Sequence, residues 1–347
     1  MEHQENDAPR PVPLAADNFT PPSRTPWGGR RIPALKGLAG DAVVGESWEL
    51  SVEPSFPSRT ADGRRLDDLV AATPEAWLGD ERARGGTALL VKLLDAADEL
   101  SVQIHPGDDH PGLGPDESGK PESWYVVDHD EGAGIYLGLA ERADRATMER
   151  ALDAGEDVSA LLPFVPVEPG DFFLIEAGTP HCIGRGVLLV EPQRVLPGRR
   201  GVTYRYWDWN RRYDARGRRD PSGEPRPLHR DAALDVTDWR LPRGDALLSR
   251  VRHRAGPPMV DGDARLEGLA GPDGALRSEA LAVARLSGTG TLRPPAWGVL
   301  RGLTVLSGTV RLGDLALGPG RSAAIPARWH GPLTLDRGHA ILAATPA

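Results

Sequence analysis

The segment 101–105 places three polar side chains on one face of a predicted strand. Because side chains alternate along a strand, Ser101, Gln103 and His105 point one way and Val102 and Ile104 the other. A half-buried strand usually presents solvated charges on its polar face. A hydroxyl, an amide and an imidazole in a row instead suggest a binding or catalytic role.

Two other segments offer side chains that could join Gln103 and His105. His181 ends the segment 170–181, where Gly178 permits a tight turn that feeds the imidazole into the next strand. Glu122 shares a face with Trp124 and Val126 on a second predicted strand. Two imidazoles, a carboxylate and an amide oxygen suit a borderline divalent ion such as zinc.

Each of these residues also has an ordinary structural explanation. A single histidine in a β-turn is more often a surface or hydrogen-bonded residue than a ligand, and a single glutamate is usually solvated. The four residues taken together favour a metal site, but their spacing alone does not decide between a metal site and ordinary structural roles. A structural site built only from thiolates is excluded, because Cys182 is the only cysteine.

Composition restricts the class of protein. The chain has 347 residues and a net charge of −9, which argues against a nucleic-acid partner. No run approaches 18 apolar residues, so we expect no membrane partner, and the N-terminal stretch lacks the features of a secretory signal. With one cysteine, these features predict a cytoplasmic protein, a monomer or weak homo-oligomer.

The pattern along the chain predicts a mainly β fold. Frequent, scattered glycine and proline favour many short strands, and helical spacing occurs only at 64–79 and at 142–165, with a break at Gly155. Residues 1–20 are predicted to form a flexible tail. The segments 169–181 and 319–330 both read Pro-Gly, then a small turn, then His, as two β-barrels in tandem would produce.

Several motifs together resemble class I mannose-6-phosphate isomerases, a cupin family. They occur in the family's order over residues 27–230, and the C-terminal part resembles the family's second barrel more weakly. The resemblance implies two cupin-like (jelly-roll) barrels with a few short helices: a zinc-binding catalytic domain over 21–235 and a metal-free domain over 245–347. The matching motifs are WGGRRI, VGESWELS, LLVKLLDAADELSVQIHP, GKPESWYVVD, GDFFLIEAGTPHCIGRGVLLVEPQ, TYRYWDWNRR and PRPLH.

The resemblance implies a zinc-dependent interconversion of mannose 6-phosphate and fructose 6-phosphate through an enediol, with one zinc ion per chain. The implied substrate is a phosphorylated hexose. The family's metal ligands map onto Gln103, His105, Glu122 and His181. The other implied site residues are the catalytic Glu191, Arg205 and Lys120, with Ser101, Lys120 and Arg205 contacting the substrate.

One segment departs from the family pattern. Between the acidic residue and the "TYR" motif, residues 192–202 are longer, basic and interrupted by Pro-Gly. We expect Arg194, Arg199 or Arg200 either to add phosphate contacts or to reshape the pocket for another sugar. The alternative functions are therefore an isomerase of a different sugar and a cupin that binds sugar or metal without catalysis.

Overall fold

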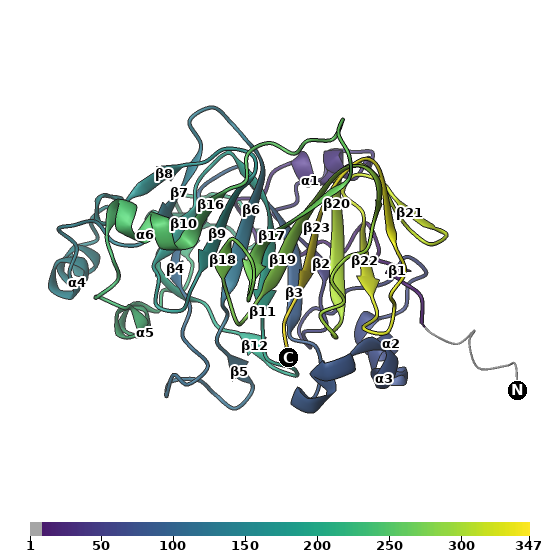
Figure 1. Ribbon diagram of the computed structural model, residues 1–347. Helices are drawn as coiled ribbons and strands as arrows, with labels where there is room; N and C mark the ends of the chain where they lie inside the picture. Colours follow the sequence, from purple (N-terminus) through teal and green to yellow (C-terminus); the bar gives the residue numbers. More distant parts are fainter. Residues whose placement is uncertain (1–8) are drawn as a thin grey trace, which may run out of the picture.

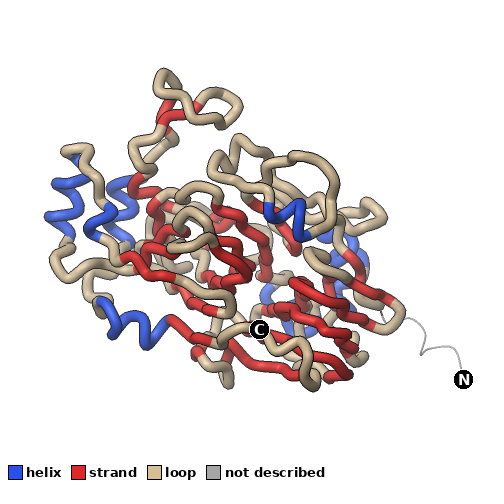
Figure 2. The backbone as a smooth tube through the Cα atoms, turned by 90° about the horizontal axis from the view of Figure 1, so that it is seen from above, coloured by secondary structure: helices blue, strands red, loops and turns tan. Residues whose placement is uncertain are grey.

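The computed structural model describes residues 9–347 and is built mainly from strands, arranged as three larger sheets side by side (Figure 1). A six-stranded sheet lies in the middle, a five-stranded sheet covers one of its faces, and an eight-stranded sheet backs the other. Most helices lie around the outside of the sheets (Figure 2).

The six-stranded sheet has the order β16-β9-β6-β11-β3-β2, and all its neighbouring strands are antiparallel. Its central strands are buried on both faces, which explains their nearly continuous apolar sequences. The strands are β2 (Glu46–Leu50), β3 (Leu89–Ala96), β6 (Glu122–His129), β9 (Asp171–Ile175), β11 (Val187–Arg194) and β16 (Arg252–Arg254).

The five-stranded sheet has the order β13-β4-β10-β7-β8. Glycine at position 178, with a φ of 78°, makes the tight turn between β9 and β10 and so connects the two sheets. The strands are β4 (Val102–Ile104), β7 (Gly134–Leu137), β8 (Phe164–Pro166), β10 (His181–Ile183) and β13 (Tyr204–Trp207).

The eight-stranded sheet contains most of the C-terminal third. Its order is β1-β22-β20-β23-β19-β17-β18, with β21 paired to β20. Bulges in β20 and β23 let the two halves of these long strands share one core. The strands are β1 (Val12–Pro13), β17 (Arg265–Gly271), β18 (Leu276–Arg277), β19 (Ala282–Leu292), β20 (Arg301–Leu312), β21 (Leu315–Leu317), β22 (Ser322–Ile325) and β23 (Leu333–Ala344).

The helices are short. Within residues 9–347, none is long and apolar enough to cross a membrane. They are α1 (Arg31–Leu35), α2 (Leu66–Ala72), α3 (Pro74–Trp77), α4 (Arg145–Asp153), α5 (Arg230–Val236), α6 (Gly244–Val251), η1 (Gly79–Arg84) and η2 (Ser159–Leu161). Two small ladders complete the structure: β5 (Glu117–Ser118) with β12 (Arg200–Gly201), and β14 (Arg212–Tyr213) with β15 (Glu224–Pro225).

The mainly β prediction is confirmed, and helices form within both segments that show helical spacing. The two closed barrels are not confirmed, because no sheet within residues 9–347 closes into a ring of paired strands. Of the predicted tail, residues 1–8 lie outside the described residues. Residues 12–13 form β1, which pairs with β22 of the eight-stranded sheet.

The middle sheet contributes to two cores. Trp124 and Val126 belong to the cluster shared with the five-stranded sheet and with α4 and α5. Tyr125, between them on the opposite face of β6, belongs to the cluster shared with β19 and β23. Its hydroxyl lies 2.9 Å from Nε2 of His339, so β6 is held from both sides.

A buried ion pair joins the N-terminal segment to the eight-stranded sheet. Nζ of Lys36 lies 2.6 Å from Oε1 of Glu49 and donates to the carbonyl of Gly320, and the Ser322 hydroxyl donates to Oε2 of Glu49. Both charged side chains are at most 1% exposed, so neither charge can be stabilised by water if its partner is removed.

We expect Lys36→Met to lower the free energy of unfolding by about 3–5 kcal/mol, because it leaves the Glu49 carboxylate buried without its cation. The double variant Lys36→Met/Glu49→Leu should lose less than the single variant. Urea denaturation of both proteins measures the difference. A single variant within about 1 kcal/mol of the parent would show that the pair is not needed for stability.

Candidate metal centre and adjoining cavity

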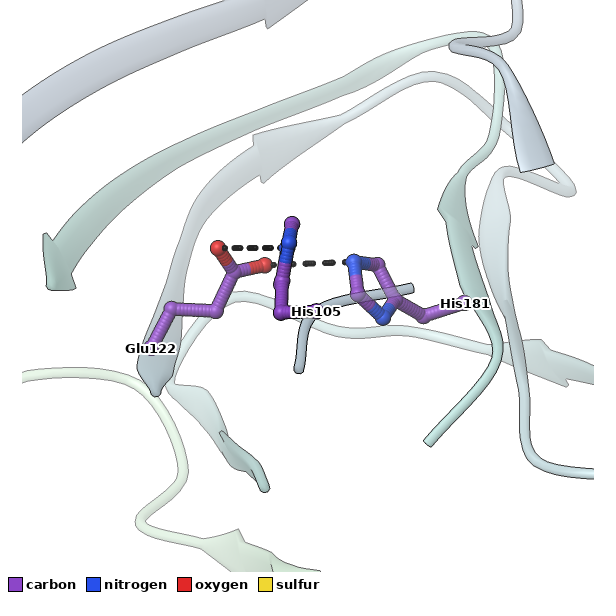
Figure 3. Close-up of side chains that lie close together, drawn as sticks. All are labelled: His105, Glu122 and His181. Carbon is purple, nitrogen blue, oxygen red and sulfur yellow. Dashed lines mark ion pairs between the residues drawn. The ribbon is translucent and has the colours of Figure 1, made fainter. Parts of the chain in front are cut away.

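Three buried side chains from separate parts of the chain converge where the middle and five-stranded sheets meet. His105 follows β4, Glu122 begins β6 and His181 begins β10. Their candidate ligand atoms all lie within 4.8 Å of one another, and each side chain is at most 1% exposed. Figure 3 shows the two imidazoles and the carboxylate pointing toward a common centre.

Hydrogen bonds to the backbone fix the protonation of both imidazoles. Nδ1 of His105 lies 3.0 Å from the carbonyl of Val202, and Nδ1 of His181 lies 2.8 Å from that of Thr179. Because a carbonyl only accepts, each Nδ1 must carry the proton, and each Nε2 presents a lone pair to the centre.

The charges around Glu122 favour an anionic carboxylate between neutral imidazoles. Burial lowers the pKa of His105, and it lowers that of His181 to about 3. Burial alone would raise the pKa of Glu122. The positive charge of the neighbouring Lys120 opposes burial, and the pKa of Glu122 lies well below its usual range.

This donor set fits a divalent cation. Nε2 of both histidines and Oε1 of Glu122 are buried and have no hydrogen-bond partner within residues 9–347. The Nε2 atoms lie 3.2 and 3.4 Å from the carboxylate oxygens, so lone pairs face lone pairs. Such an arrangement is unfavourable unless a cation lies between them.

Gln103 lies in the same row of side chains as His181. It is the register partner of His181 across β4 and β10, and of Arg205 across β4 and β13. Directly opposed residues of antiparallel strands share a face, so all three point to the same side of the five-stranded sheet.

A polar cavity of about 360 Å³ lies beside the three converging side chains, because its lining includes Lys120, which donates to Glu122, and Gln103, the register partner of His181. The predicted residues Ser101, Gln103, Lys120, Glu191 and Arg205 all line it. The structure therefore brings every predicted site residue either to the metal centre or to this cavity. The lining also includes residues that sequence analysis did not single out: Arg24, Glu46, Lys92, Arg226 and His229.

Glu191 is the buried carboxyl group of the cavity. Its Oε1 accepts a hydrogen bond of 3.0 Å from the Trp124 indole, and its Oε2 lies 3.4 Å from Nζ of Lys92. Burial and the negative charge of Glu122 raise the pKa of Glu191 to about 7, against the opposing effect of Lys92. A carboxylate with a pKa near neutral is suited to accept and return a proton.

Arginine side chains form a cationic wall on the other side of the cavity. Nε of Arg205 donates to the Ser101 hydroxyl at 3.1 Å, and a second nitrogen donates to the carbonyl of Pro227 at 2.7 Å. Arg226 is held by two hydrogen bonds to Asp208. Burial lowers the pKa of Arg205 to about 10, so it remains a cation at neutral pH.

The basic segment 192–202 reaches the cavity through only one of its three candidate arginines. Arg194 pairs with Asp108, and Arg199 donates to the carbonyl of Glu117. Arg200 pairs with the Glu117 side chain and lines the cavity.

One missed residue had a detectable signal. Lys92 is the only cation in the apolar strand Leu89–Ala96, where burial on both faces requires it to find a carboxylate partner. Arg24 and Arg226 come from loops whose approach to the cavity no local pattern indicates.

Comparisons with known proteins agree with the fold. The type I phosphomannose isomerase catalytic domain matches residues 27–132. The chain is 35% identical over 215 residues to a mannose-6-phosphate isomerase of Streptococcus mutans, covering 60% of this chain and 63% of that protein. A mannose-6-phosphate isomerase of Bacillus subtilis is 36% identical over 220 residues, covering 61% of this chain and 64% of that protein.

The likeness of folds extends further along the chain. A crystal structure of mannose 6-phosphate isomerase from Bacillus subtilis superposes with a TM-score of 0.72 at 23% identity, covering 96% of this chain and 99% of that one. The apo form from Salmonella typhimurium gives a TM-score of 0.67 at 15% identity, covering 98% of this chain and 100% of that one.

The chain thus has the mainly β fold of the mannose-6-phosphate isomerase structures, with a buried His-Glu-His group that could hold a metal ion. The resemblance to class I mannose-6-phosphate isomerases, indicated by the sequence motifs, is confirmed. By sequence, the chain spans about 63% of the length of the first of these curated relatives.

We expect the full chain to bind one Zn²⁺ ion and His181→Ala to lose this binding, because one of three converging lone pairs is removed. The affinity for Zn²⁺ should fall by more than the factor of about 10–100 that is lost when a hydrogen-bond partner of a ligand is removed. Calorimetric titration of metal-free protein with Zn²⁺ measures it. The exposed His330 provides the control, since His330→Ala should bind like the parent. Equal binding by both variants would exclude His181 as a ligand.

Proposed function

We propose that the protein is a zinc-dependent aldose–ketose isomerase that interconverts mannose 6-phosphate and fructose 6-phosphate. The observation that carries this proposal is the buried group of ligand atoms without hydrogen-bond partners in the described residues, beside a polar cavity. That cavity is lined by arginine side chains and by Glu191, whose pKa is raised to about 7. The names of the relatives support the same reaction.

In this proposal, His105, Glu122, His181 and Gln103 hold one zinc ion per chain. Two neutral imidazoles, one carboxylate and one amide leave the site with net positive charge. When bound, the ion acts as a Lewis acid that stabilises negative charge developing on substrate oxygens.

Glu191 is the proposed base that moves a proton between C1 and C2 of the sugar. Its carboxylate is buried against Trp124 and Lys92, which orient it, and its raised pKa suits a group that must both take and return a proton. An enediol is then the intermediate between aldose and ketose. Lys120, which lines the cavity, assists proton movement or neutralises phosphate charge.

The arginine side of the cavity is the proposed position of the phosphate group. Arg205, fixed by Ser101 and Pro227, offers a planar guanidinium to phosphate oxygens, and the Ser101 hydroxyl can donate a further hydrogen bond. Arg200 supplies an additional cation at the cavity from the segment that departs from the family. A phosphorylated hexose is therefore the expected substrate.

We also propose a division into two cupin-like units. We assign residues 21–235 to the catalytic unit and residues 245–347 to a metal-free unit, although β16 of the second range completes the middle sheet. Cytoplasmic localisation and a monomeric or weakly oligomeric state remain predictions.

The second candidate function is isomerisation of a different sugar, because the segment 192–202, which departs from the family pattern, lines the cavity through Arg200 and Gly201. A non-catalytic sugar- or metal-binding cupin is disfavoured, since Glu191 and its partners Trp124 and Lys92 would serve no purpose in binding a metal.

Activity before and after metal removal tests the proposal. We expect the full chain to interconvert mannose 6-phosphate and fructose 6-phosphate, to lose activity on dialysis against a chelator, and to recover it with Zn²⁺. A panel of other aldose and ketose phosphates and free sugars serves as the comparison. Activity only on another sugar would establish the second candidate, and inactivity on the whole panel would reject an isomerase.

We expect Glu191→Gln to lower kcat by about 10²–10⁴-fold, because an amide of the same shape cannot accept the proton. Zinc content should stay at the parent value, since Glu191 is not among the three converging ligands. Steady-state kinetics with metal analysis measure both quantities. Parent-like turnover in this variant would remove Glu191 from the reaction.

A further inference from the structure

The two oxygens of the Glu122 carboxylate have different surroundings. Oε2 accepts a hydrogen bond of 2.6 Å from Nε2 of Gln193 and one of 2.8 Å from Nζ of Lys120. Oε1 is buried and has no hydrogen-bond partner within the described part of the chain. Both oxygens face the candidate ligands, since Oε2 lies 3.2 Å from Nε2 of His105 and Oε1 lies 3.4 Å from Nε2 of His181. Only Oε2 also accepts hydrogen bonds from the protein.

Strand register places Gln193 at this position. On β11 it is the direct partner of Glu122 on β6, and its side chain is completely buried. Opposed residues of antiparallel strands share a face, so the amide reaches the carboxylate without any loop having to be ordered. Only Nε2 can face the carboxylate, because an amide oxygen there would oppose another acceptor.

Gln193 belongs to neither the cavity nor the proposed ligand set. It does not line the cavity, whereas Lys120 does. Its own Oε1 is buried and has no partner among residues 9–347, which is unfavourable for folding. A side chain kept at such a cost is better explained by its contact with Glu122 than by packing.

We propose that Gln193 is a positioning residue for the metal centre: its amide holds Oε2 of Glu122 so that Oε1 is the oxygen presented to the cation. This inference rests on the proposed metal site. Lys120 shares the task, but its ammonium group also faces the substrate cavity. The neutral amide keeps the carboxylate oriented when Lys120 turns to substrate, and it does so without adding positive charge near the bound ion.

The test is the affinity of the metal-free full chain for Zn²⁺ alone, measured by competition with a chromophoric chelator. Gln193→Met keeps the volume of the side chain and removes the amide. We expect it to bind Zn²⁺ about 10–100-fold more weakly than the parent. The control is Arg194→Met on the next residue, whose side chain lies on the opposite face of β11, pairs with Asp108, and should leave affinity unchanged.

A second measurement separates positioning from a purely structural role. If Gln193 only supports packing, Gln193→Met lowers the melting temperature of the metal-free protein and leaves Zn²⁺ affinity at the parent value, which overturns the proposal. If it positions Glu122, the rise in melting temperature on adding Zn²⁺ shrinks relative to the parent. The visible spectrum of the Co²⁺-loaded variant should also change, because the carboxylate can rotate.

Gln193→Asn keeps the amide on a side chain that is too short to reach Glu122. It replaces Gln193→Met as the test variant if Gln193→Met yields little folded protein. It should show the same loss of affinity, and parent-like affinity would again overturn the inference. Zn²⁺ binding by the parent chain distinguishes failure of the metal site from failure of the role proposed for Gln193. A parent that binds no Zn²⁺ removes the metal site itself, whereas a parent that binds tightly alongside unaffected variants removes only the role of Gln193.

Discussion

A carboxylate without access to water lies where the middle and five-stranded sheets meet, and much of the surrounding structure serves to stabilise it. Glu122 is surrounded by Lys120, by the Gln193 amide and by two imidazoles whose tautomers are fixed from behind by backbone carbonyls. Burial, together with the negative charge of Glu122, raises the pKa of Glu191, the group proposed to move the proton. The charge of this one residue therefore acts both on the candidate metal ligands and on Glu191.

Strand register, more than loop conformation, produces the geometry of the site. Gln103 lies between His181 and Arg205 because β4 pairs with both β10 and β13. Lys92 and Glu191 are also direct register partners, as are Glu122 and Gln193. A slip of one residue in either ladder would turn these side chains to the opposite face, so the pairing that stabilises the sheets also specifies the site.

The sequence revealed the parts of this arrangement that depend on local pattern. Alternation predicted which side chains of β6 face the site, and the glycine turn predicted the delivery of His181. The positions of Lys120, Glu191 and Arg205 followed only from the resemblance, because nothing local distinguishes them from ordinary charged residues. Gln193 escaped notice because its partner is fixed by long-range pairing, and Arg24 because it approaches the cavity from a loop. The open edges of the sheets, where closed barrels were expected, likewise depend on contacts that no short segment encodes.

The strand β6 carries Glu122 into the metal centre on one face and Tyr125 toward His339 of the eight-stranded sheet on the other. The eight-stranded sheet is thus a backing for β6, and a chain that lost this sheet would expose an apolar face of the middle sheet. What this backing demands is mainly a matching apolar surface, which many sequences can supply. The sequence match to the Streptococcus mutans protein covers 60% of the chain, whereas the fold match to the Bacillus subtilis structure covers 96%.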